Sequence, residues 1–159
     1  MARLVQSAER ASLHQFHSDE EKCMRYMLLI YTREDAIARS SQEEMLQLMT
    51  DHLSVMQAGR AEGVLEAAER LANTSTATTV RMQNSNAIIT DGPFAETKEQ
   101  LAGYYILDCK DLDEAIAWAS RIPTGCGGMQ GCVEIRPLRA VPTNAEELQL
   151  AKSSAARNG

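Results

Sequence analysis

The sequence predicts one α+β domain in which an antiparallel sheet carries its helices on one face. Three observations predict it. Two continuous apolar runs, at 25–31 and 103–109, contain the aromatic and β-branched residues typical of central strands. Two segments with helical periodicity each follow a capping signature. Turn-forming residues at 84–86 divide a stretch rich in Thr, Val and Ile, as a hairpin requires.

The first half contains a strand and a helix. The run at 25–31 is bounded by charged residues and suits a strand covered on both faces. Ser40 or Ser41, followed three residues later by Glu43 or Glu44, predicts a helix start, and Gly63 is a suitable end. One face of this helix carries Met45, Met49, His52 and Met56.

Three strand-like segments follow. Residues 64–71 give a weak signal, whereas 76–82 and 86–90 predict a hairpin. After a turn at 91–94 and a polar segment, 103–109 is the second central strand.

The second helix begins at Asp111, with Glu114 three residues on, and ends at Pro123. Residues 131–138 alternate apolar and polar side chains, which predicts a strand with one solvated face and with Pro137 at its end or on an edge. The helix is expected to bury the stripe Leu112, Ala115, Ile116, Ala119 and Ile122.

This order, β, α, β-hairpin, β, α, β, predicts a ferredoxin-like βαββαβ plait with both helices on one face. The opposite face stays open, and sheet-to-sheet pairing commonly buries it, so we expect a homodimer. We expect the domain at 24–139, a flexible N-terminal tail at 1–23, and a C-terminal tail at 140–159 with a short helix.

Composition and charge argue against two classes of partner, nucleic acids and membranes. The 159 residues include 44% apolar and 24% charged residues, which is typical of a globular domain, and the net charge is −6. Without a basic stripe we expect no nucleic-acid partner. No apolar run approaches the roughly 20 residues that cross a bilayer, and acidic residues interrupt the N-terminus, so we expect no membrane partner and a cytoplasmic location. The four cysteines are then expected to be thiols.

The segment Thr90-Asp91-Gly92-Pro93-Phe94-Ala95-Glu96-Thr97-Lys98-Glu99-Gln100-Leu101 resembles the signature of the DGPF branch of YCII-related proteins. Segments 24–31, 111–115 and 133–138 are similar to the same family in the same order. The resemblance implies a small, cofactor-free dimer of the dimeric α/β-barrel type, often encoded near extracytoplasmic-function sigma factors. Some relatives resemble lyases or dehydrochlorinases in which a His-Asp pair is proposed to be catalytic.

His52 and Asp91 are the candidate catalytic residues. His52 is the only histidine inside the predicted domain, and imidazole is a general base near neutral pH. The alternative is a buried histidine that hydrogen-bonds a neighbour. Asp91 either orients that histidine or serves as a turn former.

The candidate binding residues are Phe94, Glu96, Lys98, Tyr104 and Arg81. Glu96 and Lys98 point to opposite sides of an extended chain and are otherwise solvated loop charges. Tyr104 and Tyr105 alternate across a strand, so one is core and the other can reach a cleft. Arg81 belongs either to a surface ion pair with Glu134 or to an anion-binding cluster that also includes Arg136.

The cysteine spacings match no zinc or redox motif, so we expect no metal, and the resemblance to YCII-related proteins implies that no cofactor is bound. Three functions remain open. The first is a lyase- or isomerase-like enzyme acting on a small polar molecule through His/Asp chemistry. The second is a non-catalytic ligand-binding or regulatory dimer, with a sigma factor as a candidate partner. The third is a structural dimer without ligand.

Overall fold

The computed structural model describes residues 23–126 and 131–156. Residues 1–22 of the tail predicted at 1–23, and residues 127–130 of the glycine-rich stretch, lie outside these residues. The elements in chain order are β1 (Met24–Thr32), α1 (Glu34–Ile37), α2 (Gln42–Ala61), β2 (Leu65–Arg70), a 3₁₀ turn (Thr74–Thr76), β3 (Thr78–Gln83), β4 (Asn86–Asp91), β5 (Gln100–Cys109), α3 (Leu112–Ala119), β6 (Cys132–Pro137) and α4 (Ala145–Ala155).

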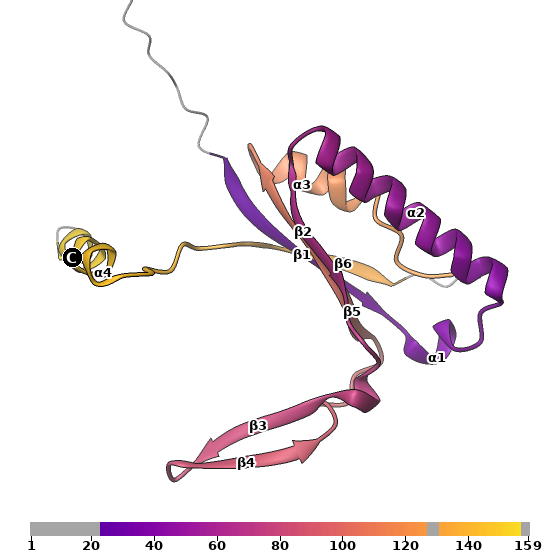
Figure 1. Ribbon diagram of the computed structural model, residues 1–159, viewed down its shortest axis with the longest axis horizontal. Coiled ribbons are helices and arrows are strands. Elements are labelled where there is room, and N and C mark those ends of the chain that lie inside the picture. Colours follow the sequence, from indigo (N-terminus) through magenta and orange to yellow (C-terminus); the bar gives the residue numbers. More distant parts are fainter. Residues whose placement is uncertain (1–22, 127–130, 157–159) are drawn as a thin grey trace, which may run out of the picture.

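The main sheet has four strands in the order β2-β5-β1-β6, and each neighbouring pair is antiparallel. Helices α2 and α3 lie on one face of it (Figure 1). This is the predicted ferredoxin-like plait, so the fold prediction is confirmed. The hairpin β3–β4 forms a separate two-stranded sheet that extends away from the main sheet (Figure 1).

Local signals set the helix and turn boundaries. Ser41 caps α2 in a reciprocal capping box with Glu44, and Gly63 adopts a φ of 73° just beyond the helix end. Asn84 and Ser85 turn the hairpin with φ values of 50° and 65°. Two consecutive positive φ values match the right-handed twist of the flanking strands.

Helix α2 packs on the sheet through its C-terminal half, where Val55 and Gly59 are buried. A Cβ atom built on Gly59 would lie only 3.0 Å from the Cβ of Leu65, so glycine permits the close approach of α2 to β2. The N-terminal half of α2 has no fully buried residue among those described. The helix therefore leaves a space over one end of the sheet.

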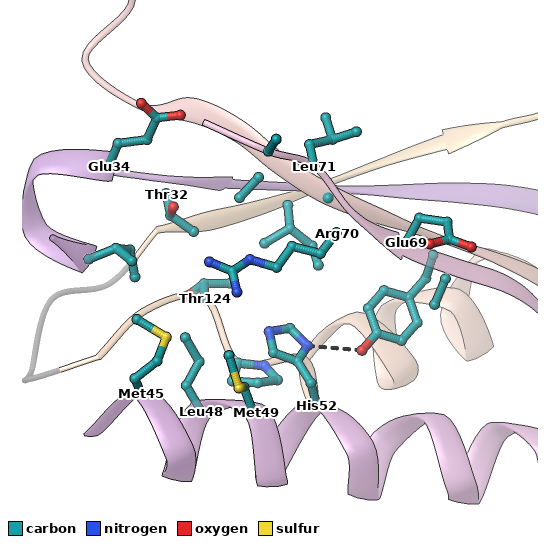
Figure 2. Close-up of a pocket in the computed structure, with 18 of the residues that line it drawn as sticks. Thr32, Glu34, Met45, Leu48, Met49, His52, Glu69, Arg70, Leu71 and Thr124 are labelled. Atoms are coloured by element: carbon teal, nitrogen blue, oxygen red, sulfur yellow. Dashed lines mark hydrogen bonds between the residues drawn. The ribbon is translucent and has the colours of Figure 1, made fainter. Parts of the chain in front are cut away.

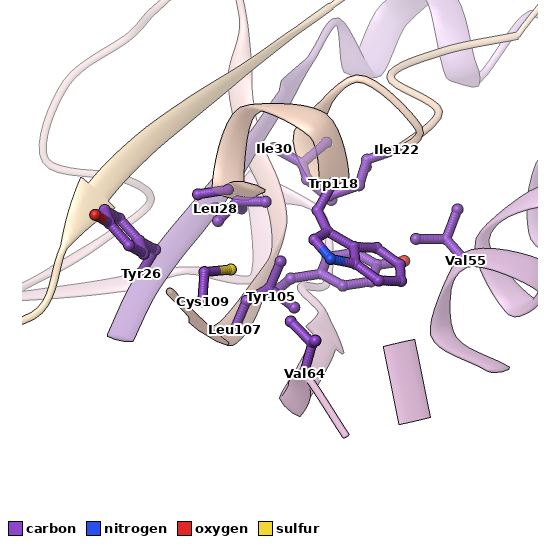
Figure 3. Packing of buried hydrophobic residues seen from close by; sticks show 11 residues of the cluster. Tyr26, Leu28, Ile30, Val55, Val64, Tyr105, Leu107, Cys109, Trp118 and Ile122 are labelled. Carbon is purple, nitrogen blue, oxygen red and sulfur yellow. The ribbon is translucent and has the colours of Figure 1, made fainter. Parts of the chain in front are cut away.

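The core lies between the sheet and the two helices (Figure 3). Alternate residues of β1 and β5 face it, together with Trp118 and Ala115 of α3. The sequence prediction for α3 was partly wrong, because Leu112 and Ile116 are exposed and Trp118 is buried. Ala115, Trp118 and Ile122 make the buried stripe. The helix turns its largest apolar side chain inward, since burial free energy rises with apolar area.

Two further expectations have clear outcomes. Pro137 ends β6, an edge strand, where it removes no ladder hydrogen bond from a central strand. All four cysteines are free thiols, as predicted. No helix in the described part of the chain has the length and apolarity needed to cross a membrane.

Candidate functional site

A cavity of about 660 Å³ occupies the space between the N-terminal half of α2 and the sheet. Methionine and leucine side chains of α2 form most of one wall, and Ile30 and Ala68 belong to the opposite wall on the sheet. Eight of the 22 lining residues carry polar side chains, several of which Figure 2 labels. They are Thr32, Glu34, His52, Glu69, Arg70, Asn73, Tyr105 and Thr124.

His52 and Tyr105 form the central polar contact of the cavity. Nδ1 of His52 lies 2.9 Å from the hydroxyl oxygen of Tyr105, and the two rings stack with an interplanar angle of 22°. The second ring nitrogen of His52 is turned toward the cavity (Figure 2). The contact fixes the orientation of the imidazole from one side and leaves Nε2 for a bound molecule.

Burial shifts the titration of both groups toward their neutral forms. The pKa of His52 is lowered chiefly by burial, and the charge of Arg70 lowers it further against the opposing effect of Asp51. Burial raises the pKa of Tyr105 to about 12. Near pH 7 the site therefore contains a neutral imidazole beside a neutral phenol.

Small residues around Tyr105 leave the room that the cavity fills. Ala68 pairs with Tyr105 across β2 and β5, and Gly103 precedes it by two positions on the same face. A Cβ atom on Gly103 would lie 2.6 Å from the carbonyl oxygen of Glu69, so a larger residue would push β2 away from β5. The α2 wall comes from the spacing of Met45, His52 and their neighbours on one helical face.

Hydrogen bonds to Glu34 connect the segments at one end of the cavity. Its carboxylate accepts from the backbone N–H of Thr74 at 2.7 Å and from the Thr74 hydroxyl at 2.8 Å. Its own backbone N–H donates to Oε1 of Gln100 at 3.0 Å. The start of α1, the 3₁₀ turn and the start of β5 are thus connected, although they are far apart in the sequence.

The predicted site residues separate into two places. His52 lines the cavity, whereas Asp91 lies at the end of β4 and Phe94, Glu96 and Lys98 are exposed in the segment that follows. None of the four residues outside α2, which are Asp91, Phe94, Glu96 and Lys98, lines the cavity. Within one chain, the structure does not bring the proposed His-Asp pair together.

The remaining binding candidates also lie outside the cavity. Arg81, on the hairpin, donates to the backbone carbonyl of Phe94 at 3.1 Å. It does not reach Glu134, which pairs instead with Arg136 on the same strand at 3.7 Å. Tyr104 lies on the opposite face of the sheet from Tyr105. The alternation of the two tyrosines was predicted, and Tyr105 is the one that lines the cavity.

Sequence reasoning missed Arg70 and Glu34 as cavity residues. Arg70 ends the strand whose sequence signal was weak, and Glu34 precedes the predicted first helix. Each reaches the cavity only because β2 pairs with β5 and α1 packs near the 3₁₀ turn. No short-range motif marks either residue.

Comparison with known proteins places the whole cavity inside a recognised domain. Residues 24–141 match the family described as the YCII-related domain. The chain belongs to the YCII-related family. An uncharacterized protein of Rhizobium meliloti (strain 1021) is 39% identical to this YCII-related protein over 115 residues, which cover 72% of this chain and 92% of the relative. Similarity to that protein assigns no activity.

Proposed function

We propose that this YCII-related protein is a small, cofactor-free enzyme of the lyase or isomerase kind, in which His52 transfers protons at a bound small molecule. The observation that carries the proposal is a half-buried, neutral imidazole that Tyr105 orients inside a cavity of about 660 Å³. That volume lies within the range of small-molecule sites, roughly 300–1,000 Å³. Perturbed titratable groups in a concave site are characteristic of catalysis.

The tyrosine hydroxyl supports either protonation state of the ring. When the hydroxyl accepts from Nδ1–H, Nε2 has a free lone pair and acts as a base. When Nε2 then takes a proton from the bound molecule, the ring becomes an imidazolium that still donates from Nδ1 to Tyr105. One hydrogen bond therefore persists through the transfer. General acid–base catalysis of this kind contributes about 10²- to 10⁴-fold.

A ligand and turnover screen tests the function. Purified protein is exposed to a panel of small polar metabolites, thermal unfolding detects binding, and NMR of the binding compounds detects conversion. We expect a subset to raise the unfolding temperature and at least one to be converted. A complete absence of conversion among the binding compounds would contradict the enzymatic proposal.

The homodimer remains part of the proposal. The hairpin exposes apolar side chains on both faces, and an isolated two-stranded hairpin is only marginally stable in water. These side chains are Val80, Met82, Ile88 and Ile89, and Phe94 follows them at 78% exposure. A second copy that covers the hairpin would bury them. Only through such a partner would Asp91 of one chain approach His52 of another.

Acidic substitutions in the hairpin test the dimer. Val80 and Ile89 are direct cross-strand partners, so Val80→Asp combined with Ile89→Asp places two charges in the expected interface. We expect wild type to have the mass of two chains by light scattering and the double variant to have the mass of one. Glu substituted at Gln57, exposed on α2, is the charge control and leaves the mass unchanged. A monomeric wild type would contradict the dimer.

The exposed hairpin also favours a second function, that of a regulatory protein that binds another protein. Its apolar side chains and the net charge of −6 suit a partner with an apolar, basic surface, and a sigma factor is the candidate that the family resemblance suggests. Co-purification with an extracytoplasmic-function sigma factor from the same organism, lost in the same Val80 and Ile89 double variant, would support this function, and its absence would contradict it.

A further inference from the structure

Arg70 lines the cavity but has no part in the acid–base chemistry described above. It is the last residue of β2, and its guanidinium extends into the space between the sheet and α2 (Figure 2). Among the residues that the structure describes, it forms no ion pair with a carboxylate. A cation therefore points into a largely apolar cavity without a protein anion beside it.

The acidic residues near Arg70 do not pair with its guanidinium. Both oxygens of the Glu34 carboxylate accept hydrogen bonds from Thr74. Glu69 is next to Arg70 in an extended strand, so the two side chains leave opposite faces of the sheet. In Figure 2 the Glu69 carboxylate points away from the guanidinium. The guanidinium is thus left for a bound anion.

This inference rests on the proposed function. We propose that the cavity binds a small monocarboxylate with an apolar body. Its carboxylate binds Arg70, and its reacting carbon lies beside Nε2 of His52. A planar guanidinium matches a carboxylate through two parallel hydrogen bonds. The methionine and leucine side chains of α2 contact the apolar body.

The charges of the cavity favour a monoanion over a phosphate. One guanidinium supplies one positive charge, while the Glu34 carboxylate also borders the cavity. A dianion would leave one negative charge unpaired near the Glu34 carboxylate, where like charges repel. A carboxylate is neutralised by Arg70 alone.

Paired acids and amides on the wild-type chain test the ligand class. Phenylacetate and hexanoate are compared with phenylacetamide and hexanamide by calorimetry at one pH, because each pair has the same apolar body. We expect the acids to bind at least tenfold more tightly than their amides. Phenylphosphonate, compared at a pH well above its second pKa, serves as the dianionic probe and is expected to bind more weakly than phenylacetate. Equal binding of acids and amides would overturn the proposal, and so would a preference for the phosphonate.

Arg70→Met removes the charge and keeps an unbranched apolar side chain. We expect it to remove the preference for acids over amides, with Arg70→Lys intermediate because an ammonium offers no planar fork. Arg60→Met, at the exposed C-terminal end of α2, is the matched control and keeps wild-type affinities. Unchanged acid binding by Arg70→Met, in a chain with wild-type unfolding temperature, would refute the assignment.

His52→Gln separates this inference from the enzymatic proposal. The variant is expected to bind phenylacetate within threefold of wild type, since Arg70 holds the carboxylate. Carboxylates that bind through Arg70 without any conversion would leave the ligand class standing and the enzyme refuted. If a neutral compound were converted, and its conversion required His52 but not Arg70, the enzymatic proposal would stand and the ligand class would be refuted.

Discussion

Replacing His52 with alanine is expected to lower turnover at least a hundredfold while changing the free energy of unfolding by no more than about 1.5 kcal/mol. Loss of the proton-transferring group accounts for the first effect. The second is small because His52 is only half-buried and its side chain makes one hydrogen bond, to Tyr105, in the part of the chain that the structure describes. Steady-state turnover and urea unfolding measure the two quantities on the same preparations.

The pH dependence of turnover gives an independent check. The pKa of His52 lies below its ordinary value of 6.5, chiefly through burial, so the neutral base predominates at pH 6.5 and above. Turnover is expected to be flat above that pH and to fall as pH falls below it. With the pKa of Tyr105 raised to about 12, this tyrosine adds no alkaline limb near neutral pH.

The free energy of unfolding, like turnover, is expected to decrease as pH falls below 6.5. The folded state resists protonation of His52, whereas the unfolded chain takes up the proton near pH 6.5. Stability contributed by the neutral ring is therefore present above 6.5 and is lost as pH falls toward the lower folded pKa. His52→Ala should remove this part of the dependence, and Gln57→Ala, at an exposed position of the same helix, serves as the control. A loss confined to stability, with turnover intact, would make His52 a packing residue.

Trp118→Ala is expected to destabilise the fold by about 3–5 kcal/mol, the largest stability effect that we predict. The indole is 4% exposed, and its ring lies 3.7 Å from a Cβ built on Gly59 of α2. Trp118 therefore packs where α3 and α2 meet over the sheet. Truncation would leave a void that the buried backbone cannot close. Urea unfolding of the variant measures the cost.

Ile116→Ala is the matched control on the same helix. Ile116 is 46% exposed, so its truncation is expected to cost less than about 1 kcal/mol. Arg121 lies over the Trp118 ring at 4.1 Å, and Arg121→Ala is expected to cost less than Trp118→Ala because the cation remains partly solvated. If Ile116→Ala and Trp118→Ala lowered the free energy of unfolding equally, the result would agree with the buried stripe predicted from the sequence. It would contradict the stripe observed in the structure.

The sequence by itself determined the main strands and helices and their order, although it did not predict α1 or the 3₁₀ turn. Ser41 with Glu44, Asp111 with Glu114, and Asn84 with Ser85 act through backbone groups within a few residues, so their effects are readable in the chain. The apolar runs of β1 and β5 likewise predicted the two central strands. From these elements the ferredoxin-like order followed.

Tertiary structure alone decided the site. The alternation of Tyr104 and Tyr105 was visible in the sequence, but which of them faces α2 depends on how β5 pairs with β1 and β2. Arg70 lines the cavity because a weakly predicted strand pairs at the sheet edge. Asp91 lies away from the cavity because its hairpin leaves the sheet. Backbone preferences are set by neighbouring residues, whereas contacts across a cavity depend on strands and helices that are distant in the chain.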